Sequence, residues 1–119
     1  MPDIELNSNG VNRRIKYHIL PDDEMRKIGF TDYNPKVWYF GRGIEHNISF
    51  NVSIPKNGID DLRIDVLDEE FCQPYDYQAI LDRDSDFPFA LLVERKVEKY
   101  MEYLQDKGVL SGHARGEYI

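Results

Sequence analysis

The stretch "NISFNVSI", residues 47–54, alternates strictly between large apolar and small polar side chains. Its apolar positions are Ile48, Phe50, Val52 and Ile54. Successive side chains of a strand point to opposite faces of a sheet, so one face of this strand must be buried and the other wet. A strand of this kind belongs to an antiparallel sheet that is covered on one side only. We therefore expect the serine and asparagine face to stay open to solvent or to a partner.

The flanking segments extend this strand into a three-stranded meander. The stretch "KVWYFGRGI", residues 36–44, is aromatic and β-branched, and its alternation places Trp38 and Phe40 in the core and Tyr39 on the other face. The stretch "PKNG", residues 55–58, supplies turn residues. The stretch "LRIDVL", residues 62–67, then returns with apolar side chains at every second position.

Strand and helix signals surround the meander. Residues 13–19 alternate as a half-buried strand, and "PDDEMRKIG", residues 21–29, has the early proline, opposed charges and final glycine of a short helix. A second short helix is expected over residues 75–81. Residues 87–110 hold the longest helical pattern. Its apolar stripe contains Phe89, Val93, Val97, Tyr100, Met101 and Leu104.

The resulting order, β-α-β-β-β-α-α, is typical of a small α+β domain with the long C-terminal helix packed on one face of the sheet. A chain of 119 residues makes one domain. We expect a loose arm over residues 1–12, a folded core over 13–108 and a polar tail over 109–119. A single cysteine excludes an intrachain disulfide, and the absence of an apolar leader or span favours the cytoplasm over a membrane.

The net charge of −7 is concentrated in one segment. Residues 60–86 contain ten acids and two arginines, which gives −8, whereas the other twelve acids and thirteen bases sum to +1. Phosphate groups would be repelled by such a surface, so we expect no direct binding of nucleic acid and none of an anionic membrane.

Asp82, Asp84 and Asp86 occupy the first, third and fifth positions of a calcium-loop template. The template then requires glycine and, six residues later, glutamate, but this chain has Phe87 and Val93. We therefore expect no bound metal, and Asp86 to cap the long helix instead. The chain has no dinucleotide fingerprint that opens a helix either, so no cofactor is expected.

No catalytic signature appears, so we expect a protein that is not an enzyme. The rival class is a small hydrolase that uses Cys72, which would need one of His18, His46 and His113 brought beside it by the fold. Cys72 follows Phe71, and a lone cysteine in such a place is typical of a small core residue. A further alternative is a structural protein, which would not inhibit any other protein.

The acidic link between the meander and the long helix remains the best candidate for a binding surface. It is polar, irregular and contains tyrosines, which are enriched at protein interfaces. The predicted interface residues are Asp68, Glu69, Glu70, Tyr75, Asp76, Tyr77, Asp82, Asp84 and Asp86. Their expected partner is a protein with a basic surface, such as one that normally holds nucleic acid. The simplest alternative is that this charge only keeps a small domain soluble. The oligomeric state is left open.

Taken together, "KVWYF", "ISFNVSI", "LRIDVLDEEFCQPYDYQ" and "LQDKGVL" resemble small accessory proteins encoded by phages and prophages of Gram-positive bacteria. The resemblance spans residues 13–110. It implies a compact protein that binds and inhibits a host protein, of the anti-defence or anti-CRISPR type, in some cases by mimicking DNA. It transfers no site residue to this chain.

Overall fold

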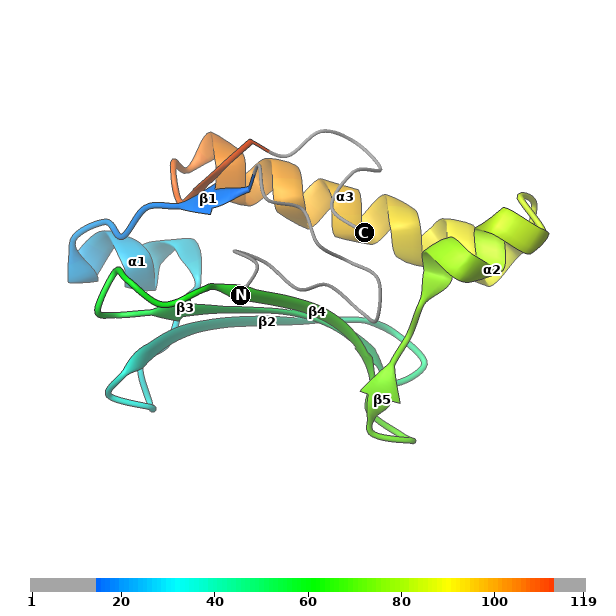
Figure 1. Ribbon diagram of the computed structural model, residues 1–119, viewed down its shortest axis with the longest axis horizontal. Helices are drawn as coiled ribbons and strands as arrows, with labels where there is room; N and C mark the ends of the chain where they lie inside the picture. Colours follow the sequence, from blue (N-terminus) through cyan, green and yellow to red (C-terminus); the bar gives the residue numbers. More distant parts are fainter. Residues whose placement is uncertain (1–14, 113–119) are drawn as a thin grey trace.

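The computed structural model describes residues 15–112. Its elements are β1 Lys16–Tyr17, α1 Asp22–Ile28, β2 Val37–Glu45, β3 Ile48–Pro55, β4 Arg63–Asp68, β5 Gln73–Pro74, α2 Tyr77–Arg83, α3 Pro88–Asp106 and β6 Leu110–Ser111. Figure 1 shows α3 lying along one face of a curved sheet, and none of the described helices lies on the opposite face. The expected α+β class, with a long C-terminal helix over an antiparallel sheet, is confirmed.

The main sheet is antiparallel, with the strand order β2-β3-β4-β5. Its first three strands are the predicted meander. The fourth, β5, pairs only Pro74 with Leu67 and Gln73 with Asp68. Sequence patterning could not find β5, because two residues are too few to show an alternation and proline is depleted in strands.

The core lies between this sheet and α3. The four apolar residues of β3 are at most 4 % exposed, and Val93, Val97, Met101 and Leu104 of α3 are fully buried. The ring of Phe50 stacks on that of Tyr100, with centroids 5.6 Å apart and planes 13° from parallel. Trp38 and Phe40 enter the same core and Tyr39 lies on the other face, as the alternation of β2 predicts.

The helix α1 follows the predicted signals. It comes directly after Pro21, has acids in its first turn and bases in its last, and ends at Gly29, whose φ of 125° favours glycine. The hydroxyl of Tyr103 donates a hydrogen bond of 2.7 Å to the carbonyl oxygen of Ile28. The end of α1 is therefore tied to α3 by a carbonyl that the helix itself leaves unpaired.

The folded core extends beyond residue 108. Val109 is fully buried, Leu110 is 2 % exposed, and β6 pairs with β1 in a second, two-stranded antiparallel sheet. The prediction of a polar tail from residue 109 is wrong for these residues, because the segment after α3 folds back over the core and closes it. The predicted arm over residues 1–12 and the rest of the tail lie outside the described residues.

The start of α3 also differs from the prediction. Phe87 occupies the N-cap position without a side-chain hydrogen bond, and Pro88 is the first helical residue. Proline fixes the backbone angle that a first helical turn needs and has no N–H group to leave unpaired. Asp86 is therefore not the cap that the sequence predicted.

Replacing Phe50 with alanine should lower the free energy of unfolding by about 3–5 kcal/mol, because it empties a fully buried site between β3 and α3. Urea unfolding followed by the fluorescence of buried Trp38 measures this loss. The matched control is Ser53→Ala on the half-buried opposite face of the same strand, which should change the stability little. Equal effects of the two substitutions would contradict the assignment of faces.

Candidate functional site

The face of the main sheet turned away from α3 is a concave surface (Figure 1). Neighbouring strands place Gly41, Asn51 and Asp65 side by side across it. The next row along the strands contains Tyr39, Ser53 and Arg63. This is the polar face that the alternation of "NISFNVSI" predicts, and it is lined by groups that donate and accept hydrogen bonds. It is less open than expected, because Ser49 is only 6 % exposed and Asn51 is half-buried.

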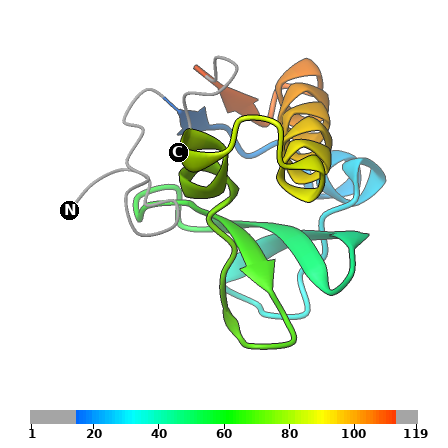
Figure 2. The same cartoon turned by 90° about the vertical axis from the view of Figure 1, so that its right-hand side faces the viewer.

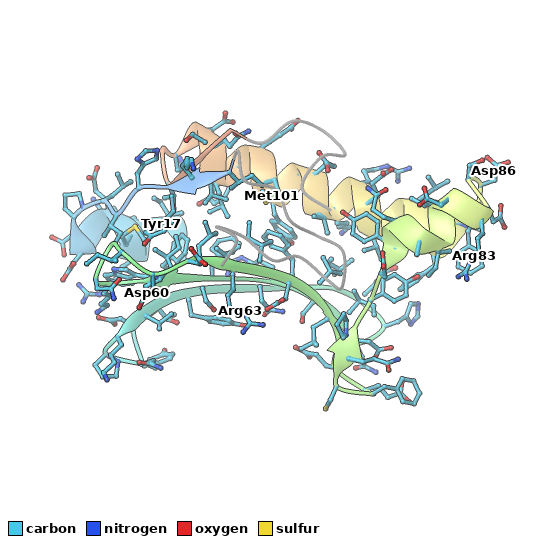
Figure 3. The ribbon with its side chains drawn as sticks, viewed as in Figure 1. Tyr17, Asp60, Arg63, Arg83, Asp86 and Met101 are labelled. Atoms are coloured by element: carbon cyan, nitrogen blue, oxygen red, sulfur yellow. The ribbon has the colours of Figure 1, made fainter. Side chains whose placement is uncertain are left out.

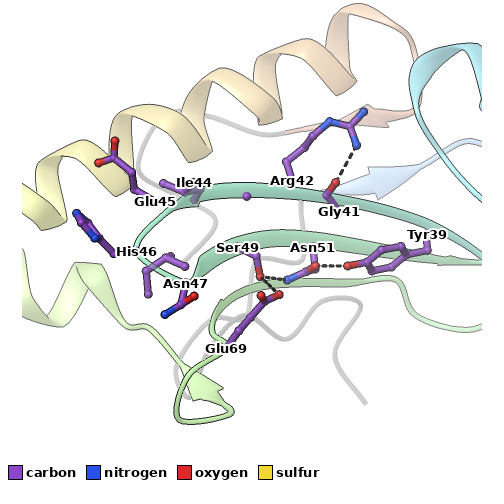
Figure 4. Close-up of a pocket in the computed structure, with 12 residues that line it drawn as sticks. Tyr39, Gly41, Arg42, Ile44, Glu45, His46, Asn47, Ser49, Asn51 and Glu69 are labelled. Carbon is purple, nitrogen blue, oxygen red and sulfur yellow. Dashed lines mark hydrogen bonds between the residues drawn. The ribbon is translucent and has the colours of Figure 1, made fainter.

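A chain of hydrogen bonds runs along this face from Tyr39 to Glu69 (Figure 4). The Tyr39 hydroxyl donates to Asn51 Oδ1, and Asn51 Nδ2 donates to Ser49 Oγ over 3.0 Å. The Ser49 hydroxyl in turn donates to Glu69 Oε2 over 2.9 Å. Every link donates in the same direction, toward the carboxylate, so each side chain fixes the orientation of the next.

The space beside this chain depends on two glycines of β2. A Cβ atom on Gly41 would lie 2.7 Å from ring carbons of Tyr39, so a side chain there would displace the tyrosine. No heavy atom lies within 4 Å of the position of a Cβ on Gly43. Gly41 therefore allows the Tyr39 ring to lie close to the strand, and Gly43 leaves the sheet surface open.

Two hollows meet on this face. One, of about 350 Å³, is lined by the hydrogen-bonded chain, the two glycines and the turn between β2 and β3. The other, of about 450 Å³, is lined by Tyr33, Arg63 and neighbours at the opposite end of β2. Tyr39 borders both hollows and is 42 % exposed, whereas Tyr33 is 93 % exposed. The tyrosines thus mark a continuous surface along the sheet.

The electrostatics of this face favour a neutral tyrosine among carboxylates. Burial raises the pKa of Tyr39 above its ordinary value, and the negative charges of Glu69 and Asp65 raise it further. Burial also raises the pKa of Asp65, and the charge of Arg63, whose Nε lies 4.0 Å from its carboxylate, opposes this shift. Near neutral pH the hydroxyl of Tyr39 therefore keeps its proton and donates a hydrogen bond.

The predicted acidic interface is divided by the fold into two groups. The hairpin acids, Asp68, Glu69 and Glu70, lie at the β4–β5 hairpin beside the concave face. The turn acids, Asp82, Asp84 and Asp86, lie at the far end of the molecule where α2 passes into α3 (Figure 3). Apart from Asp68, which is half-buried, these side chains are exposed. They do not form one patch with the hairpin acids.

The other predicted interface residues support the fold. Asp76 caps α2 by accepting a hydrogen bond of 3.0 Å from the Ala79 N–H. Tyr75 is half-buried against Phe89, and burial raises the pKa of its hydroxyl. Tyr77 is fully buried, so its prediction as an exposed interface anchor is wrong. The helix α2 turns this side chain into the core, which a reading of the link as irregular could not anticipate.

Cys72 is exposed at the β4–β5 hairpin, with a left-handed φ of 53°, so its prediction as a core residue is wrong. Its Sγ lies 3.8 Å from the carbonyl oxygen of Glu69. His46 packs on Phe89, His18 lies 3.2 Å from the hydroxyl of Ser111, and His113 falls outside the described residues. Among the described hydrogen bonds, none joins Cys72 to a histidine.

Within residues 15–112, no three His, Cys, Asp or Glu side chains are grouped closely enough to hold a metal ion. The helices of the same range include none that is long and apolar enough to cross a membrane. Comparison with known protein families, curated proteins and solved structures finds no match for this chain. The geometry of the concave face is therefore the main guide to function.

Replacing Asp65 with asparagine should raise the free energy of unfolding at neutral pH, because it removes a charge that burial disfavours. The folded-state pKa is raised, so the folded protein binds this proton more tightly and the wild type recovers stability as the pH falls. The difference between the two proteins should therefore shrink as the pH approaches 3.8, the ordinary value for aspartate. Urea unfolding over a pH series measures it.

The control is Asp82→Asn, which removes an exposed carboxylate of the same type and should change the stability little at any pH in the series. If the difference in the free energy of unfolding between wild type and Asp65→Asn grew on acidification, it would contradict a raised pKa of Asp65.

Proposed function

We propose that this protein is a non-enzymatic binding module that recognises a basic protein surface through its concave sheet face and the adjoining hairpin acids. The observation that carries the proposal is the hydrogen-bonded chain from Tyr39 to Glu69 on an uncovered sheet face. Polar side chains that are already held in place lose little conformational freedom when a partner binds. Such a surface is suited to recognition.

The shape and chemistry of the face favour a protein partner. Its two hollows are joined along a strand, as a broad surface for several side chains requires. Tyr33 and Tyr39 present large exposed rings with polar tips, a type of side chain that often contributes strongly to protein interfaces. The carboxylates of Asp65 and Glu69 would pair with lysine or arginine.

The charge distribution supports a basic partner. Residues 60–86 carry a net charge of −8, and the hairpin acids are the part of that charge that adjoins the concave face. Complementary charge accelerates the encounter of two proteins and disfavours acidic competitors. A host protein whose basic surface normally holds nucleic acid fits this description. A phage accessory protein that blocks such a protein in the host cytoplasm is the biological setting that we propose.

The sharpest test compares two pairs of acids with the same change in charge. One variant carries Glu69→Gln and Glu70→Gln at the hairpin, and the other carries Asp82→Asn and Asp86→Asn at the distant turn. A partner is first captured from a lysate of Gram-positive bacteria at low salt, and its association rate with each variant is then measured over a salt series. The hairpin variant should associate about tenfold more slowly, with a flatter salt dependence.

The turn variant serves as the control, because its acids lie away from the concave face. It should keep an association rate within about twofold of the wild type. Equal effects of the two variants would show that net charge alone steers binding. An unchanged rate for the hairpin variant would contradict the proposed surface.

Replacing Cys72 with alanine distinguishes this proposal from the hydrolase alternative. The binding module should keep its partner affinity, because the exposed thiol takes no part in the hydrogen-bonded chain. Binding measured by calorimetry and folding measured by circular dichroism are the two readouts. A folded variant that loses all biological activity while it still binds the partner would favour the enzyme.

A further inference from the structure

A hollow of different character lies on the other side of the sheet, between β2 and α3. It has a volume of about 250 Å³ and is lined by Phe40, Arg42, Lys99, Tyr100 and Tyr103, which we call the aromatic slot. The rings of Tyr100 and Tyr103 both lie near that of Phe40, with centroids 6.3 and 6.2 Å away. Pockets for drug-sized ligands generally begin at roughly 300 Å³, so the slot has the size of a single inserted side chain.

Two cationic side chains, Arg42 and Lys99, line the slot. Figure 4 shows Arg42 pointing from β2 toward α3, where its guanidinium lies 4.1 Å from the centre of the Phe40 ring and donates to the carbonyl oxygen of Gly41. Lys99 is exposed beside it on α3. Among residues 15–112, no ion pair within 4.0 Å involves either cation. The slot therefore suits an aromatic side chain accompanied by a carboxylate.

The same chain presents such a group at the tip of the β4–β5 hairpin. Phe71 is 65 % exposed and directly follows Glu70, whose side chain is also exposed. The backbone N–H of Glu70 donates to Asp68 Oδ1 over 3.0 Å, and that of Phe71 donates to the same oxygen over 3.3 Å. These bonds hold the backbone of the tip, so insertion into a pocket would mainly cost the conformational freedom of the exposed side chains.

The hairpin cannot reach the slot of its own molecule. Figures 1 and 2 show that it projects from the sheet on the side away from α3, whereas the slot opens between β2 and α3. The two complementary surfaces therefore face different directions on one domain. An arrangement of this kind joins one copy to the next through unlike surfaces, which produces rings or open chains instead of closed two-fold dimers.

We propose that this protein self-associates head to tail, with Phe71 of one copy in the aromatic slot of the next and Glu70 beside Arg42 and Lys99. The proposal shares Glu70 with the surface proposed above, but Phe71 and the slot residue Lys99, which its test replaces, take no part in that function. The contact is much smaller than a standard interface of roughly 1,600 Å², so association is weak and depends on concentration. It is also weakened by salt, since the charged groups are near the surface.

The test is sedimentation of the full chain over a wide range of concentration, with variants at each half of the contact. The wild type should show an average mass that rises steadily above that of the 14.0 kDa chain. Phe71→Ser removes the inserted ring and Lys99→Glu reverses a charge at the slot. Each variant alone should associate at least tenfold more weakly than the wild type. Both replaced side chains are exposed, so both variants should fold.

An equimolar mixture of the two variants gives the decisive result. The Phe71→Ser chain keeps an intact slot and the Lys99→Glu chain keeps an intact hairpin, so together they should form a species of two chains and none larger. Combining Glu70→Lys with Lys99→Glu in one chain exchanges the charges and should restore association. A mixture that stays monomeric, or a wild type that is monomeric throughout, would overturn the proposal.

Phe87→Ser is the matched control, since Phe87 is 40 % exposed and also follows acids, Asp84 and Asp86, but lies at the start of α3. It should associate like the wild type. A loss of association equal to that of Phe71→Ser would show general adhesion of exposed rings and would overturn the specific contact.

Discussion

The packing of one face of β3 on α3 is the constraint on which the rest of the structure depends. Phe50 is fully buried at the centre of this contact and stacks on Tyr100. Because strand side chains alternate, burying Phe50 necessarily turns Ser49 and Asn51 to the other side of the sheet. The same packing therefore creates both the core and the concave polar face. A change in the register of β3 would alter both.

The concave face and the aromatic slot are the two surfaces that this arrangement creates, and they differ in chemistry. On the concave face, hydrogen bonds link polar side chains from Tyr39 to Glu69, and the hairpin acids lie beside them. The slot lies on the helix side of β2, where aromatic rings meet Arg42 and Lys99. One domain therefore carries an acidic, hydrogen-bonding surface on one side of the sheet and a cationic, aromatic hollow on the other.

The acidic segment shows how far a sequence can be misleading about a surface. Ten acids within residues 60–86 suggest a single patch, yet the fold carries Asp82, Asp84 and Asp86 to the end of the molecule and leaves Glu69 beside Ser49. Residues far apart in the chain, not neighbours in the acidic run, make up the candidate site. The pairing of β2 with β3 brings Tyr39 and Asn51 into the candidate site. The only sign of this in the sequence was the predicted polar face of β3.

The sequence by itself determined the class of the fold, the meander of β2, β3 and β4, the helices and the faces of β3, because alternation and helical periodicity are local properties of the chain. Tertiary structure decided where the ends of these elements meet. It placed Tyr77 in the core, paired β6 with β1 and aligned Tyr39 with Asn51 and Glu69. Such contacts depend on strand register and on the packing of distant segments, and no local pattern of residues records either.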